Sequence, residues 1–193
     1  MLLNNITQSK KIGSDIYCRP LLQIEFQPFD FGEMPSIPRK IADFYGELLG
    51  AYLSSAENQL GERIKNEYGS LGTDEKKRYR NKYCKISSEA ALREFDSREY
   101  LSVTIKISLF EGARRNRLYC YREGHIWNIQ KQYLLSKKDI IREFDLKRSE
   151  GFDKKQLKSF CGAFFSGPSV AFITGNGKDG SAHDIAFPMQ LER

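Results

Sequence analysis

The longest regular pattern in the chain is a run of apolar residues between Pro38 and Gly69 that recur at three- and four-residue steps. This spacing places them on one face of a helix and leaves the polar residues on the other. Pro38 suits the start of such a helix, and Gly69 or Gly72 suits its end. The pattern predicts one long helix packed on a sheet. Its apolar face consists of Ile41, Phe44, Tyr45, Leu48, Leu49, Tyr52, Leu53, Leu60 and Ile64.

Most other patterned segments alternate apolar and polar residues, which is the two-residue period of a half-buried strand. The clearest case is Tyr100 to Phe110, where apolar residues at odd positions alternate with serine, threonine and lysine. One face of this strand is therefore predicted to be wet, and the sheet to be antiparallel. Strands are predicted at residues 16–31, 85–95, 100–110, 116–122 and 125–133, on both sides of a turn at 166–168, and from 183 to Pro188.

Turns and short helices complete the predicted order of elements. Residues 96–99 and the pair Glu123–Gly124 read as hairpin turns. Ser136 is a predicted N-cap, and Asp139 three residues later completes a capping box for a short helix that runs to Phe144. Residues 152–160 form a further candidate helix.

One long helix followed by a run of strands predicts an α+β fold, with an antiparallel sheet, the long helix packed across one face, and short additional helices. Of the 193 residues, 40% are hydrophobic and 29% charged, which suits a globular chain with a real core. Residues 1–15 are polar and unpatterned, so they are predicted to be a flexible arm. Residues 16–193 are predicted to form a single domain.

The net charge indicates which kinds of binding partner are expected, and the cysteines indicate the redox compartment of the protein. The formal net charge of +6 favours acidic partners, but the basic residues are spread along the chain, which weakens a nucleic-acid function. The four cysteines lack zinc-ligand spacing, and Cys18, Cys84 and Cys120 fall in apolar or alternating segments. Free thiols in a reducing compartment are therefore expected, with no metal and no cofactor. These cysteines are Cys18, Cys84, Cys120 and Cys161.

No signal peptide or membrane span is predicted from the sequence. The first residues lack the apolar core of a signal peptide, and no window approaches 18 consecutive apolar residues. The chain as written is therefore expected in the cytosol. If an anchor or signal has been removed from it, the same chain would be extracytoplasmic.

The stretch GNGKDGSAHD, residues 175–184, combines a glycine-rich loop with a His-Asp pair. In a phosphate-binding loop a Ser or Thr follows the lysine and a helix comes next, but here Lys178 precedes Asp179 and a strand follows. Neighbouring strand residues also point to opposite faces, which separates His183 from Asp184. The stretch is predicted to be a hairpin loop, and no catalytic residue is assigned.

Two basic clusters and a group of aromatic residues are the candidate binding residues. Basic residues interleaved with tyrosines occur at 76–83, and a second cluster follows Ala113; either would suit an acidic partner. Tyr and Trp in one strand region can stack on a sugar or base, or simply pack. The candidates are Arg114, Arg115, Arg117, Tyr119, Tyr121, His125 and Trp127.

The chain contains, in order, the stretches Leu21–Phe26, Arg39–Tyr68, Tyr100–Val103, Glu111–Ala113, Leu134–Ile141 and Ile185–Pro188. This order of elements resembles the extracytoplasmic domain of the RsiV-type anti-sigma factors, which also occurs at the N-terminus of some peptidoglycan deacetylases. The resemblance covers residues 16–190, but the usual GGAH turn reads Glu111-Gly-Ala-Arg114. It implies an α+β binding module without a catalytic centre; in the family's best understood members, such a module recognises a lysozyme.

We therefore expect a non-enzymatic binding module that recognises a protein or an anionic glycan through the sheet face and the loop at 111–117. The alternative is a nucleic-acid-associated protein that uses the clusters at 76–83 and 114–117. A hydrolase built on His183 or His125 ranks last, because no catalytic spacing occurs in the sequence.

Overall fold

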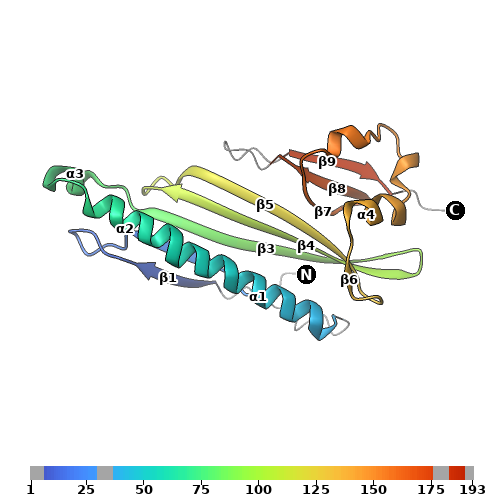
Figure 1. Cartoon of the computed structure of the whole chain (residues 1–193), viewed down its shortest axis with the longest axis horizontal. Coiled ribbons are helices and arrows are strands. Elements are labelled where there is room, and N and C mark those ends of the chain that lie inside the picture. The colour runs from blue at the N-terminus through green and yellow to red at the C-terminus, as the bar shows by residue number, and fades with distance from the viewer. Residues whose placement is uncertain (1–6, 30–36, 176–182, 190–193) are drawn as a thin grey trace. The chain divides into compact units, whose positions relative to one another are not determined.

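The computed structural model describes residues 7–29, 37–175 and 183–189. Within these residues nine strands form a mixed sheet in the order β1-β2-β3-β4-β5-β7-β8-β9, with β6 paired to β5 (Figure 1). The strands are β1 (Gln8–Ile12), β2 (Leu22–Phe26), β3 (Lys82–Phe95), β4 (Arg98–Glu111), β5 (Asn116–Asn128), β6 (Tyr133–Leu134), β7 (Phe160–Ser166), β8 (Ser169–Thr174) and β9 (His183–Pro188).

The prediction of an antiparallel sheet is wrong, because two of its strand pairs are parallel. Strand β2 runs parallel to β3, with Ile24 opposite Cys84, and β5 runs parallel to β7 where Gly124 lies opposite Gly162. Both pairs join strands that lie far apart in the sequence. Alternation of apolar and polar residues reports which face is wet, and it carries no information about strand direction.

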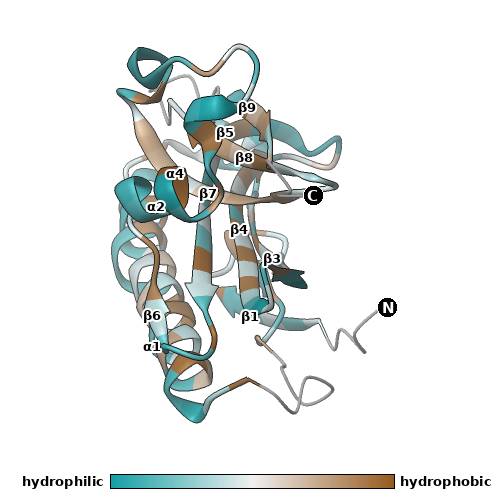
Figure 2. Cartoon of the chain, turned by 90° about the vertical axis from the view of Figure 1, so that its right-hand side faces the viewer, coloured by the Kyte–Doolittle hydropathy of each residue, from teal (hydrophilic) through white to brown (hydrophobic). Residues whose placement is uncertain are grey.

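Strand β4 also differs from the expected half-wet strand. Its apolar and polar residues do alternate (Figure 2), but Tyr100 to Val103 are all buried, and Ser102 is only 4% exposed. The Ser102 hydroxyl accepts a hydrogen bond from the Phe165 backbone N–H at 3.1 Å. A buried hydroxyl is tolerated in a core when it has a hydrogen-bond partner. The polar side chain of Ser102 therefore does not indicate an exposed position.

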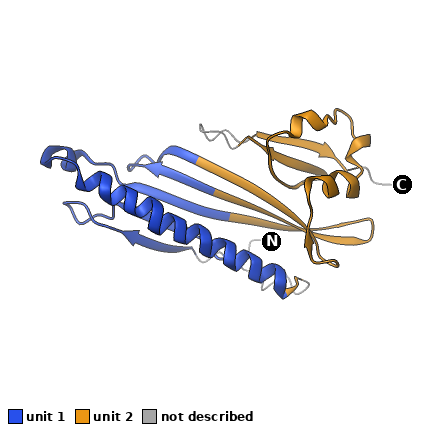
Figure 3. Cartoon of the chain, in the orientation of Figure 1, with its two compact units in different colours: residues 1–35, 39–87, 107–119 blue, residues 36–38, 88–106, 120–193 orange. Residues whose placement is uncertain are grey.

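The chain divides into two compact units, each assembled from three separate stretches (Figure 3). Unit 1 comprises residues 1–35, 39–87 and 107–119, and unit 2 comprises residues 36–38, 88–106 and 120–193. The long strands β3, β4 and β5 each contribute residues to both units. Whether residues 16–193 behave as a single domain stays a prediction.

In unit 1 the predicted long helix is confirmed, since helical residues run without a break from Arg39 to Gly69 (Figure 1). They comprise α1 (Arg39–Ser55), the π-helical turn η1 (Ala56–Leu60) and α2 (Gly61–Gly69). The apolar face packs on β2 and β3, where Leu49 and Ile64 join Ile24 and Cys84 in one buried cluster. The short helix α3 (Thr73–Arg78) follows.

Two N-terminal segments of unit 1 differ from the sequence-based expectation. Part of the predicted arm forms β1, which pairs antiparallel with β2; its Gln8 to Lys11 are exposed and show no apolar pattern. The predicted strand from Ile16 begins only at Leu22, because residues 15–19 form a turn around the buried Asp15. Cys18 is therefore an exposed turn residue with a φ of 61°, and not a strand thiol.

The Asp15 carboxylate organises this turn. It accepts hydrogen bonds from the backbone N–H groups of Tyr17 at 2.8 Å and Arg19 at 2.9 Å, and from Arg19 Nε at 2.8 Å. Burial alone would raise the pKa of Asp15, but these bonds outweigh it and hold the pKa below its usual value. The turn is therefore stabilised by an ionised carboxylate.

In unit 2 the predicted hairpin turn at Glu123–Gly124 is wrong, because β5 runs through it from Asn116 to Asn128. Gly124 lies so close to β7 that a Cβ atom there would sit 2.6 Å from the carbonyl oxygen of Ala163. Glycine inside a strand often marks a close backbone approach, and this is the physical reason for Gly124. The turn at Asp96–Ser97 does exist, with both residues at positive φ.

The capping box of the predicted short helix is confirmed. Helix α4 (Lys137–Glu143) has Ser136 as its N-cap, whose hydroxyl accepts from the Asp139 backbone N–H at 3.2 Å. The Asp139 side chain in turn accepts from the Ser136 N–H, also at 3.2 Å. Ile140 and Ile141 on this helix are buried in the core of unit 2.

Two 3-10 turns, η2 (Leu146–Arg148) and η3 (Lys154–Leu157), follow helix α4. The candidate helix at 152–160 is therefore reduced to the single turn η3.

Across the described residues, no helix is both long and apolar enough to cross a membrane.

Candidate functional site

A cleft of about 540 Å³ in unit 1 brings together the two basic clusters that lie far apart in the sequence. Its walls come from the turn before β2, the start of β3, and the loop between β4 and β5. We call it the basic cleft and define it by four cations and two rings: Arg19, Arg80, Lys82, Arg115, Tyr79 and Tyr83.

Backbone hydrogen bonds fix the three walls to one another. The Lys82 N–H donates to the Leu21 carbonyl at 2.8 Å, and the Gly112 N–H donates to the Asn81 carbonyl at 2.9 Å. The Asn81 side-chain amide also donates to the Pro20 carbonyl. The loop can turn against β3 because Gly112 adopts a φ of +69°, which favours glycine, and lies against the Arg80 side chain. The cleft is therefore built into the sheet end and does not depend on side chains alone.

The four cations differ in how far the fold already neutralises them. Lys82 forms an ion pair with Glu111, and Arg19 pairs with Asp15 at 2.7 Å. Arg80 has no ion-pair partner among the residues that the structure describes. Arg115 likewise has none there, and its guanidinium lies 4.1 Å from the centre of the Tyr83 ring. Arg80 and Arg115 are thus the charges that remain for a ligand.

Both tyrosine rings of the cleft are packed against other side chains. Tyr83 lies against Arg115 and 5.9 Å from Phe110, and its hydroxyl donates to Glu25. Tyr79 packs edge-on against Tyr68 at 5.0 Å, with the Lys82 amine 5.7 Å from its ring. These contacts reduce the ring faces open to a stacked base, which bears on the choice of ligand.

The Tyr79 hydroxyl is buried and has no hydrogen-bond partner among the described residues. Burial and the nearby charges of Glu67 and Glu111 raise the pKa of Tyr79 to about 12, so the hydroxyl stays protonated at neutral pH. By contrast, the Tyr68 hydroxyl accepts from the Ile16 backbone N–H at 2.8 Å.

We expect the substitutions Y79F and Y68F to have opposite effects on stability. Removing a buried hydroxyl without a partner should raise the free energy of unfolding by about 1 kcal/mol, whereas removing the acceptor of Ile16 should lower it by about 1 kcal/mol. Urea unfolding followed by far-UV circular dichroism measures both. Equal destabilisation by the two changes would contradict the unpaired state of Tyr79.

The seven candidate binding residues are distributed over the two units, and their role in binding stays a prediction. Arg115 lines the basic cleft, while Arg114 and Arg117 are exposed neighbours in the same loop and at the start of β5. Only the first three residues of the cluster at 76–83 do not line the cleft: Lys76 contacts the Tyr68 ring at 5.6 Å, and Lys77 pairs with Asp74 at 2.9 Å. Arg19 belongs to the cleft, although the sequence pattern placed it in a strand.

Tyr119 lies instead at an apolar groove of about 680 Å³ in unit 1. The groove runs between the π-helical turn η1, with Ala56 and Gln59, and strand residues such as Ile107. Tyr119 is 40% exposed there and its neighbour Leu118 49% exposed. Tyr119 therefore lines a different cavity from Arg115.

The remaining candidates, Tyr121, His125 and Trp127, belong to unit 2. Trp127 is only 5% exposed, so its ring packs inside the unit. Burial lowers the pKa of His125, and the opposing charge of Glu123 does not restore it, so the imidazole is neutral at pH 7. The Tyr121 hydroxyl donates to Glu123 at 2.8 Å.

The His-Asp pair lies in β9, while residues 176–182 of the glycine-rich stretch fall outside the described residues. Asp184 pairs with Arg122, whose Nη1 atom lies 2.9 Å from both carboxylate oxygens. His183 is exposed. Asp184 is therefore bound to a cation, as in an ordinary structural ion pair.

Comparisons with known proteins add two structural neighbours. No family model matches the chain, and no curated protein matches it. A member of the DUF3298 family from Bacteroides fragilis is similar in structure, with 11% identity, a TM-score of 0.47, and coverage of 96% of this chain and 89% of that one. A DUF3298 family protein from Pseudomonas aeruginosa has 11% identity and a TM-score of 0.38, and the match covers 95% of this chain and 90% of that one. The resemblance to the RsiV-type and deacetylase modules stays a prediction.

Proposed function

We propose that the protein is a non-enzymatic binding module whose basic cleft takes a carboxylate-rich segment of a partner, either an acidic stretch of a protein or an anionic glycan. The observation that supports this most is the convergence of Arg80 and Arg115, from two separate basic clusters, on one cavity. Neither has a carboxylate partner among the described residues. A planar guanidinium binds carboxylates through paired hydrogen bonds, which suits both kinds of ligand.

The structure favours this proposal over the nucleic-acid alternative for one specific reason. Single-stranded nucleic acid combines phosphate contacts with bases stacked on open aromatic rings. In the basic cleft, Tyr79 and Tyr83 already pack against Tyr68 and Arg115. The cleft thus offers charge with little open ring surface. A cytosolic location stays a prediction.

The test compares binding of three labelled probes to the full chain: a polyglutamate peptide, hyaluronate and single-stranded oligothymidine. We expect the carboxylate probes to bind at low salt, and the double variant R80S/R115N to bind them at least about tenfold more weakly, because two charge-assisted contacts are lost. Asparagine is chosen at Arg115 because it tolerates the positive φ of 49° found there.

A matched control removes two charges of unit 1 outside the cleft. R39S/K40S alters the exposed start of α1, where Arg39 is 93% exposed and its pair with Asp43 spans 3.7 Å. This change should leave binding nearly intact, because neither residue lines the cleft. Equal binding by the wild type and R80S/R115N would overturn the proposal. Preferential binding of oligothymidine, with a salt dependence that R80S/R115N reduces, would favour the alternative.

A further inference from the structure

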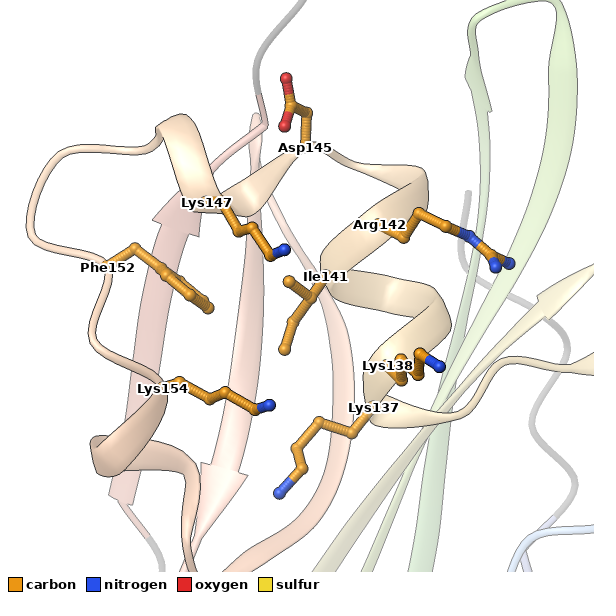
Figure 4. Close-up of a pocket in the computed structure, with 8 residues that line it drawn as sticks. All are labelled: Lys137, Lys138, Ile141, Arg142, Asp145, Lys147, Phe152 and Lys154. Atoms are coloured by element: carbon orange, nitrogen blue, oxygen red, sulfur yellow. The ribbon is translucent and has the colours of Figure 1, made fainter.

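A second cavity, of about 460 Å³, lies wholly within unit 2 and belongs to none of the candidate residues above (Figure 4). Helix α4, the turns η2 and η3, and the loop that carries Phe152 surround it. Its volume falls within the range of small-molecule sites in proteins. We call it the lysine pocket.

The floor of the lysine pocket is apolar. Ile141 of α4 is only 6% exposed and belongs to the core of unit 2, and Phe152 packs against that core with its ring 5.1 Å from Phe187. Figure 4 shows both side chains directed into the space between α4 and the Phe152 loop. A ligand that covers this floor would remove apolar surface from water, which is favourable by about 25 cal/mol per Å².

Cationic side chains surround this floor, and few carboxylates are present to neutralise them. The side chains of Lys147 and Lys154 point into the cavity beside Ile141 (Figure 4). The single carboxylate of the lining, Asp145, pairs with Arg148 at 3.1 Å. The cations of the lining are Lys137, Lys138, Arg142, Lys147 and Lys154.

Two of these cations are held by partners within unit 2. The Lys137 amine donates to the Leu157 carbonyl at 3.0 Å, and Arg142 pairs with Asp139 at 2.9 Å. Lys138, Lys147 and Lys154 have no ion pair with any residue in the described ranges. Like charges gathered beside an apolar surface repel one another more strongly than in bulk water. An anion in the pocket would relieve this repulsion.

We propose that the lysine pocket binds a small amphiphilic anion, with one carboxylate or phosphate group on an apolar acyl or aromatic body. The anionic group lies between Lys147 and Lys154, whose side chains point into the cavity, and the apolar body covers Ile141 and Phe152 (Figure 4). Flexible lysine amines suit a single compact anionic group, since they act as adjustable point charges. The site lies in unit 2 and shares no residue with the basic cleft, so it goes beyond the proposed function and is tested separately.

The test is a titration of the ¹⁵N-labelled full chain with octanoate, followed by amide chemical shifts. We expect the shifts to cluster at residues 137–157. Octanol lacks the charge and inorganic phosphate lacks the apolar body, so each should bind at least about tenfold more weakly than octanoate. Octanoate shifts centred elsewhere, or phosphate binding as tightly as octanoate, would overturn the proposal.

Variants connect the binding to the lysines. K147S/K154S changes two exposed lining residues and should weaken octanoate binding by about tenfold or more, whereas K155S/K158S changes two exposed lysines outside the lining and should leave it unchanged. An equal effect of the two variants would contradict a specific site. A second arm uses vesicles of phosphatidylglycerol: co-sedimentation that depends on Lys147 and Lys154 identifies a lipid headgroup as the source of the anion. Binding of octanoate without vesicle binding identifies a free acid.

Discussion

The substitution G162A is expected to lower the free energy of unfolding of unit 2 by about 3 to 5 kcal/mol, because the change forces two backbones apart. A Cβ atom at Gly162 would lie 2.3 Å from both the backbone nitrogen and the carbonyl oxygen of Gly124. Gly162 also has a φ of +152°, which L residues rarely adopt. It follows a bulge in β7, where the pairing with β8 shifts between Phe160 and Gly162.

Gly124 on the facing strand should behave similarly, because its Cβ would lie 2.6 Å from the Ala163 carbonyl oxygen. Urea unfolding can be followed by the fluorescence of Trp127, the single tryptophan of the chain, which is buried in unit 2. We expect G162A and G124A to shift the midpoint to much lower urea.

The controls are glycines with open space around them. Gly46 and Gly50 lie on the exposed face of α1. Apart from its chain neighbours and the backbone of its own helix, no atom of the described residues would lie within 4 Å of a Cβ atom at either position. G46A and G50A should each raise the stability of unit 1 by about 0.5 to 1 kcal/mol, because alanine favours the helix. Circular dichroism measures this change. A G162A protein as stable as the wild type would contradict the close parallel approach of β5 and β7.

Gly124 and Gly162 show why part of the fold could not be predicted from the sequence. Within its own stretch, Gly124 follows a charged residue between two apolar runs, which is the local signature of a turn. Its actual role depends on Gly162, far along the chain, which no local pattern reveals. The parallel pairs β2–β3 and β5–β7 are hidden for the same reason.

Local features, in contrast, could be predicted. The helix from Arg39 and the capping box of Ser136 and Asp139 each depend on residues within a few positions of one another. The candidate site is an intermediate case. The sequence predicts the cluster at 114–117 as a candidate binding element, which stays a prediction. The meeting of Arg80 with Arg115 depends on the hydrogen bond between Gly112 and Asn81, and no sequence pattern indicates Arg19.

The second large effect is expected at Glu143, the last residue of α4, whose side chain is only 6% exposed. Its carboxylate accepts hydrogen bonds from Arg98 at 2.8 Å and from the hydroxyl of the fully buried Tyr100 at 2.9 Å. Tyr133 adds a longer contact at 3.4 Å. E143Q keeps the shape but removes the charge that these donors share, so we expect a loss of about 2 to 4 kcal/mol at pH 7.

The loss should depend on pH in a defined direction. Burial alone would raise the pKa of Glu143, but the hydrogen bonds from Tyr100 and Arg98, with the charges of Arg98 and Lys131, outweigh it and lower the pKa. Because an unfolded glutamate titrates at about pH 4.3, the ionised group stabilises the fold above that pH. This contribution disappears as the pH falls through the lower folded pKa. The stability gap between the wild type and E143Q should therefore be largest at neutral pH and should narrow in acid.

Trp127 fluorescence during urea unfolding at pH 7 and at pH 3 measures the gap within unit 2. Asp15 and Asp139 also have lowered pKa values, so both proteins should still lose stability in acid, and only the difference between them reports on Glu143. E150Q, at an exposed position of the same unit, should match the wild type at both pH values. A gap that stays constant from pH 7 to pH 3 would show that E143Q acts through packing and not through the lost charge.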